Sequence, residues 1–79
     1  MNNNYISLNH LPLGGKCKVK ELNSNGLLRR RLLDLGLIND TIIEALQKSP
    51  SGDPVAYLIR GAVIALRTEV SSMILVEII

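Results

Sequence analysis

The chain has 79 residues, of which 47% are hydrophobic and 20% are charged, and its formal net charge at pH 7 is +2. This length predicts one domain over residues 1–79 and leaves no room for a second, and the aliphatic content argues against a disordered chain. The apolar runs are too short to span a membrane, and we expect no signal peptide. A single cysteine cannot form an internal disulfide and fits a reducing compartment, so we expect a cytoplasmic protein.

The first part of the chain is polar and then rich in turn-forming residues. Residues 1–6 have the composition of a polar tail, of which residues 1–5 are expected to be flexible. The segment 10–15 contains a proline and two adjacent glycines and predicts a loop that ends in a turn. The segment 16–21 alternates lysines with apolar residues, which predicts a half-buried strand.

A helix is expected near residues 27–35. The leucines that recur there with the helical period are Leu28, Leu32 and Leu35. They predict a helix that covers one end of the fold. Gly36 follows, in the position where a left-handed helix cap favours glycine, and Leu37 is then expected to fold back onto Leu32.

The second half of the chain has the alternation typical of strands. The expected strands are 41–48, 55–59, 63–66 and 73–79. Turn formers at 49–54 join the first two as a hairpin, and Gly61 interrupts the pattern before the third. Thr68 is expected to cap a single helical turn that ends at Ser72.

Short strands with one helix inserted after the first predict a mainly β fold, a small closed barrel of about five strands. Closure would remove the edges that invite aggregation of such aliphatic strands. An SH3-like barrel and an OB-fold are both candidates. The turn at 49–54 and the helical turn before the last strand favour the SH3-like form.

Three adjacent arginines, Arg29, Arg30 and Arg31, are not explained by helix energetics. The dipole of a helix favours acids in its first turns, and Arg30 precedes Asp34 in the weaker of the two pairing orders. These arginines are therefore either a solvated face or groups that a partner uses.

Five blocks stand in a defined order along the chain. They are Leu8…Leu11…Gly14, Leu28 to Leu37, Asp53-Pro54, Arg60-Gly61 and Ile64 to Arg67. Together they resemble the ferrous iron transport protein A family, FeoA, from about Ile6 to Val76. The resemblance implies a small cytoplasmic SH3-like domain that works with FeoB, a membrane Fe(II) transporter with a cytoplasmic GTPase domain. One departure is that Asn39 and Asp40 replace the family's usual turn residues, although both tolerate left-handed turns.

The sequence contains neither the motifs expected of an enzyme nor the ligand pattern expected of a metal site. There is no phosphate-binding loop, no nucleophile with a partner base, and no pair of carboxylates close in sequence. Cys17 and His10 are the only soft or borderline metal ligands, and they are not spaced as a pair. We expect Cys17 in the core, His10 in a loop or at the barrel edge, and no cofactor.

Nucleic-acid binding is the alternative function. Lysines of the first strand and arginines of the helix could form one basic patch: Lys16, Lys18, Lys20 and Arg29 to Arg31. Two observations argue against this hypothesis: the net charge is low, and two tyrosines are the only phenylalanine, tyrosine or tryptophan residues on which bases could stack. A free-standing regulatory domain related to the C-terminal domain of iron-dependent repressors is a further alternative.

The preferred hypothesis is a non-enzymatic accessory protein that docks on the cytoplasmic side of FeoB and modulates its assembly or activity. The expected docking residues are Arg29, Arg30, Arg31, Leu37 and Ile38. Both apolar members could instead belong to the core. We expect the protein to be cytoplasmic and to lie at the inner face of the membrane through its partner, without inserting into the membrane. We expect no specific binding of nucleic acid, and at most weak self-association.

Overall fold

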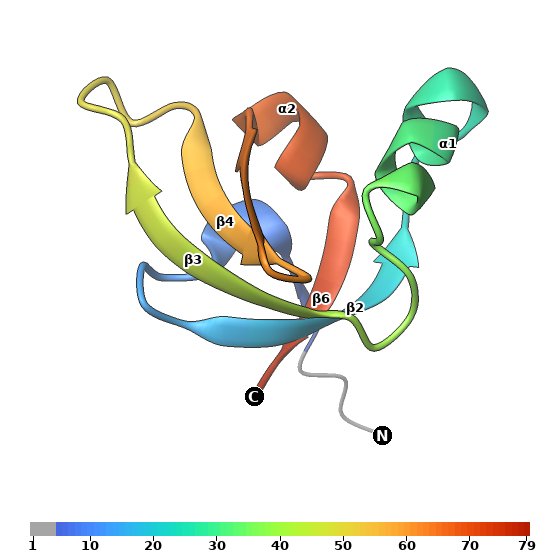
Figure 1. Cartoon of the computed structure of the whole chain (residues 1–79), viewed down its shortest axis with the longest axis horizontal. Coiled ribbons are helices and arrows are strands. Elements are labelled where there is room, and N and C mark those ends of the chain that lie inside the picture. The colour runs from blue at the N-terminus through green and yellow to red at the C-terminus, as the bar shows by residue number, and fades with distance from the viewer. Residues whose placement is uncertain (1–4) are drawn as a thin grey trace.

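The computed structural model describes residues 5–79, which form one strongly curved antiparallel sheet with two helices at one end (Figure 1). The strands are β1 (Tyr5–Ser7), β2 (Lys16–Leu22), β3 (Ile42–Lys48), β4 (Val55–Ile59), β5 (Ala62–Leu66) and β6 (Ile74–Ile78). The helical elements are the 3-10 turn η1 (Leu8–His10), α1 (Gly26–Asp34) and α2 (Thr68–Ser71). The mainly β fold class is confirmed.

The six strands are ordered β1-β6-β2-β3-β4-β5, and β1 and β5 are the two edges of the sheet. The expected small barrel thus has six strands instead of about five, and it is not closed by hydrogen bonds, because no ladder joins β1 to β5 within residues 5–79. The helical turns that follow these two strands, η1 and α2, contact each other instead. One consequence is that β5 keeps a free edge.

The core is aliphatic and lies inside the curve of the sheet. Its buried members are Leu8, Leu11, Cys17, Val19, Leu22, Leu32, Leu37, Ile43, Ala45, Tyr57, Ile59, Leu66, Ile74 and Val76. The half-buried strand predicted at 16–21 is confirmed, because Cys17 and Val19 of β2 point inward while their neighbours are partly or fully exposed. Ile43 and Ala45 of β3 point inward in the same way. Alternation of this kind follows from the period of two along a strand.

The N-terminal segment differs from the prediction. Tyr5 and Ile6, expected in a polar tail, lie in β1 and pair with Glu77 and Val76 of β6. A strand of three residues has too little alternation to be recognised, and its pairing partner is far away in the sequence. The rest of the expected tail, residues 1–4, lies outside the described residues.

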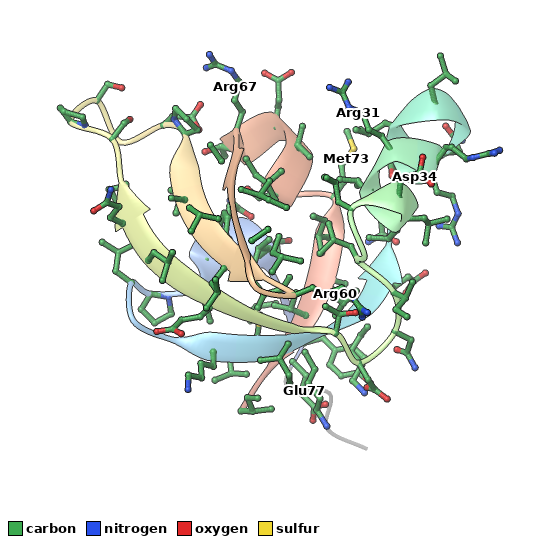
Figure 2. All side chains as sticks on the ribbon, in the orientation of Figure 1. Arg31, Asp34, Arg60, Arg67, Met73 and Glu77 are labelled. Atoms are coloured by element: carbon green, nitrogen blue, oxygen red, sulfur yellow. The ribbon has the colours of Figure 1, made fainter. Side chains whose placement is uncertain are left out.

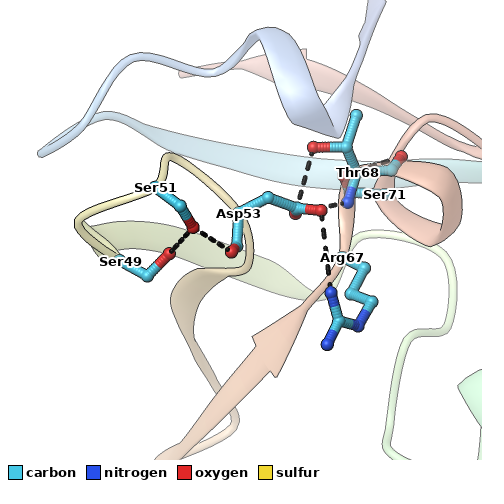
Figure 3. A network of polar contacts seen from close by, with 6 residues as sticks. All are labelled: Ser49, Ser51, Asp53, Arg67, Thr68 and Ser71. Atoms are coloured by element: carbon cyan, nitrogen blue, oxygen red, sulfur yellow. Dashed lines mark hydrogen bonds and ion pairs between the residues drawn. The ribbon is translucent and has the colours of Figure 1, made fainter.

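The cap of α2 also differs from the prediction, because a carboxylate distant in sequence replaces the expected Thr68 cap (Figure 3). The backbone N–H of Thr68 donates to Oδ1 of Asp53 at 2.8 Å, and the Thr68 hydroxyl donates to the same oxygen at 3.2 Å. Ser51 in turn donates to the carbonyl oxygen of Asp53. The β3–β4 loop thereby stabilises the N-terminus of α2, where an acid is electrostatically favoured.

The end of α1 is the predicted left-handed stop. Gly36 has φ +96°, its N–H donates to the carbonyl of Leu33 at 2.9 Å, and the N–H of Leu37 donates to that of Leu32 at 3.1 Å. Leu32 and Leu37 are both buried, in keeping with the apolar contact that commonly accompanies such a helix stop. The Arg60 side chain lies directly over Gly36, so an added Cβ would overlap with it.

We predict that Gly36→Ala destabilises the fold more than the matched variant Gly14→Ala. Both glycines have positive φ, but only open space surrounds Gly14. The conformational cost is about 1–2 kcal/mol for each variant, and overlap with Arg60 adds to it only at Gly36. Chemical denaturation would measure the difference. Arg60→Ala should restore part of the loss in the Gly36→Ala background, and equal losses in the two glycine variants would contradict the proposed overlap.

Candidate functional site

The three adjacent arginines of α1 point in different directions and do not form one patch. Nη1 of Arg29 donates to the carbonyl oxygen of Leu22 at 3.1 Å, which ties the helix to the end of β2. Successive residues of an α-helix are rotated by about 100°, so Arg30 faces away from the sheet and Arg31 lies on the opposite flank from Arg29. The expected docking residues are therefore distributed over three sides of the helix.

One flank of α1 faces a small depression against β2, the β2 hollow, with a volume of about 290 Å³. Arg29, Leu33 and Ile38 line it, and Ile38 is 51% exposed. Leu37, by contrast, has no exposed surface. Its assignment to an exposed docking surface is wrong, because the helix stop turns its side chain back into the core. Ile38 remains available.

The other flank of α1 faces a larger depression, the α1–β5 groove, of about 510 Å³ between α1, β5 and α2. Its walls are mostly apolar and include Leu28, Leu35 and Ile64. Of the three leucines expected to cover this end of the fold, Leu32 is buried and Leu28 packs partly buried against the core, while Leu35 is 37% exposed at the rim of the groove. Arg31 and Arg67 line the same groove, and none of its described lining residues is acidic.

The turn after α1 keeps its left-handed geometry, since Asp40 has φ +71°. Nζ of Lys20 lies 2.8 Å from Oδ1 of Asp40 and 3.6 Å from Oε1 of Glu77. The hydrogen bond from Lys20 lowers the pKa of Asp40, and the same bond raises the pKa of Lys20. The basic patch considered for nucleic acid is therefore weakened at Lys20, whose charge is paired with two carboxylates.

The two candidate metal ligands do not form a site in the described part of the chain. Cys17 is fully buried, and burial raises the pKa of its thiol to about 11, which disfavours the thiolate that binds metals. His10 is exposed at the end of η1. Within residues 5–79, no three histidine, cysteine, aspartate or glutamate side chains gather as a metal site would need.

Neither α-helix that the structure describes is long and apolar enough to span a bilayer.

Comparison with known proteins identifies the family. The model of the FeoA domain matches residues 6–78. This chain belongs to the FeoA family. It is 32% identical over 74 residues to an Fe(2+) transport protein A/Fe(2+) transporter FeoB fusion protein of Porphyromonas gingivalis, covering 94% of this chain but only 9% of that relative.

Solved structures support both the family and the predicted SH3-like fold. The FeoA-like protein of Clostridium acetobutylicum is 33% identical with a TM-score of 0.89, covering 99% of this chain and 91% of that one. The Stenotrophomonas maltophilia FeoA, an SH3 domain protein solved with zinc, is 25% identical with a TM-score of 0.82, covering 91% and 89%. A manganese-dependent transcriptional repressor shares only the fold, at 15% identity and a TM-score of 0.87, covering 100% of this chain and 44% of the repressor.

We predict that the isolated protein binds neither Fe(II) nor Zn(II) tightly. The fully buried thiol and the single exposed histidine offer no set of converging ligands. Calorimetry on the wild type and on a His10→Ala, Cys17→Ala variant should give the same weak signal. Alanine at position 17 avoids placing a hydroxyl in the core, and a melting curve checks the fold. Stoichiometric micromolar binding that disappears in the variant would show that this prediction is wrong.

Proposed function

We propose that this protein is a non-enzymatic accessory protein of ferrous iron uptake that binds the cytoplasmic side of a FeoB-type transporter and modulates its assembly or activity. The supporting observation is that the P. gingivalis relative carries both parts in one chain. Fusion makes the encounter of two domains intramolecular and raises their effective concentration.

The docking surface we propose, called here the outer face of α1, consists of Leu27, Arg30 and Leu33 on the helix together with Ile38, which follows the helix and lines the β2 hollow beside Leu33. Leu27, Arg30 and Leu33 are spaced by three residues, so their side chains follow one ridge of the helix. Leu27 is 88% exposed, Leu33 37% and Ile38 51%, which leaves apolar groups around an exposed arginine. Exposed apolar groups bordered by charge are typical of protein-binding sites, and arginine is enriched among residues that dominate binding energy.

This surface supports recognition and not chemistry. The helix stop at Gly36 and the hydrogen bond from Arg29 to the Leu22 carbonyl hold α1 at both ends of its contact with the sheet. The surface is thus preorganised, so association requires little loss of conformational entropy. Through such a partner the protein would lie at the inner face of the membrane without entering it.

We predict that Leu27→Gln combined with Arg30→Gln weakens co-purification with the full-length transporter by at least about tenfold, the equivalent of about 1.4 kcal/mol. Both side chains are exposed, so the melting temperature should change little. Arg30 is the fifth residue of α1 and lies beyond its first turn, so its replacement changes the interaction with the helix dipole little. Fe(II)-dependent growth should fall together with binding.

The matched control is Leu13→Gln combined with Lys48→Gln. Leu13 is 49% exposed and Lys48 is an exposed cation, and the two line one depression that does not involve α1. The end of β3 that carries Lys48 lies on the opposite side of the molecule from α1 (Figure 1). Full binding by the α1 variant would place docking elsewhere. Failure of the wild type to co-purify with the transporter would contradict the proposed function itself.

A further inference from the structure

The strand β5 has a free hydrogen-bonding edge. Among the described residues it pairs only with β4, to which a two-residue turn joins it. The pair that closes this two-residue hairpin is Ile59 and Ala62, which is a hydrogen-bonded pair. Along an antiparallel ladder, hydrogen-bonded pairs alternate with pairs that form no hydrogen bond. The backbone N–H and C=O groups of Val63 and Ala65 are therefore directed away from β4, toward the open edge.

This edge lacks the features that usually protect an edge strand. Its sequence is Ala-Val-Ile-Ala-Leu, without a proline or a charged residue. Val63 is 66% exposed, and Ala65 is exposed as well. Natural proteins commonly place lysine, proline or a bulge at such an edge to prevent pairing with another chain. An unprotected edge of this kind is suited to accept an added strand.

The α1–β5 groove runs beside the same edge. Its volume of about 510 Å³ is within the range of about 300–1000 Å³ found for ligand clefts. Side chains of an added strand would alternate between its two faces, so every second one would point toward Leu28, Leu35 and Ile64. The edge offers main-chain hydrogen bonds, and the groove offers the apolar contact that selects side chains.

The charges around the groove indicate what kind of partner it would bind. Arg31 and Arg67 line it from opposite sides, and Figure 2 shows both at the end of the molecule where α1 and α2 lie. Arg67 forms an ion pair with Asp53, in which Nη1 and Oδ2 are 4.0 Å apart. This pair is exposed to solvent and therefore neutralises the charge of Arg67 only weakly. A second copy of this chain fits poorly, because its own β5 carries no carboxylate that could pair with Arg31 and Arg67.

We propose that β5 accepts an extended segment of a partner protein, apolar in its centre and acidic at its ends, as a seventh strand of the sheet. Alternate side chains of the segment occupy the α1–β5 groove, and its carboxylates pair with Arg31 and Arg67. This inference does not rest on the transporter being the partner, and its test uses the isolated chain.

The probe is a synthetic peptide in which valine alternates with threonine between pairs of glutamates at both ends. Bound to the full-length, isotope-labelled protein, it should shift the amide resonances of Val63 and Ala65 and slow their hydrogen exchange. Raising the salt concentration should weaken binding, because the arginine–glutamate pairs lie partly in solvent. The same peptide with lysine in place of glutamate should not bind.

Two comparisons separate strand addition from simple apolar contact. Methylation of the peptide amides that face β5 keeps every side chain but removes hydrogen bonds, and should weaken binding by at least about tenfold. The variant Arg31→Gln with Arg67→Gln should lose most affinity at an unchanged melting temperature. The charge-matched control Lys16→Gln with Lys48→Gln should bind like the wild type.

Three results would overturn the proposal. Equal binding of the methylated peptide would exclude strand addition, and unchanged affinity in the arginine variant would exclude acidic recognition. Protection of the Val63 and Ala65 amides that grows with protein concentration, in the absence of peptide, would identify a second copy of the chain as the occupant.

Discussion

The left-handed turn at Gly36, with the Arg60 side chain packed over it, brings the end of α1 against the sheet. Gly36 allows the left-handed turn that ends α1, and Arg60, itself at φ +50°, extends its side chain across that glycine from the tip of the β4–β5 hairpin. The hydroxyl of the buried Thr41 donates to the carbonyl of Gly36 at 2.8 Å. The end of the helix, the hairpin tip and the start of β3 are thereby joined at one point.

This junction also sets the shape of the surfaces on either side of α1. The buried Leu37 follows Gly36 directly, so the helix cannot rotate without moving a core side chain. Arg29, bonded to the Leu22 carbonyl, holds the flank next to β2, while the flank next to β5 has no comparable polar tie among the described residues. The α1–β5 groove is open because α1 is anchored at its end and along one flank, and Leu35 is left at its rim.

The sequence predicted the elements well wherever a local pattern decided the structure. The alternation around Cys17 and Val19, the hairpin strand Val55–Ile59 and the stop at Gly36 all depend on neighbours close in the chain. Features that depend on distant partners were missed. β1 exists because β6 pairs with it, and α2 is capped by Asp53 from fifteen residues away.

The candidate site was predicted less well than the fold, for a geometric reason. Three arginines adjacent in sequence look like one charged patch, but the rotation of the helix places them on three sides, with Arg29 tied to β2. The free edge of β5 had no signal in the sequence, because its run of small and aliphatic residues is equally typical of an interior strand. Only the strand order shows that this run is an edge.

An accessory protein of the proposed kind acts on its partner through differences in binding free energy. Docking on a transporter changes its behaviour to the extent that one conformation of the transporter is bound more tightly than another. The outer face of α1 and the α1–β5 groove belong to the same helix. A peptide in the groove that fixes the position of Arg31 would also fix that of its neighbour Arg30 and of Leu27, which lies four residues earlier in the same helix. Any coupling between the two surfaces must be reciprocal, so a transporter bound to α1 would raise or lower the affinity of the groove by the same factor.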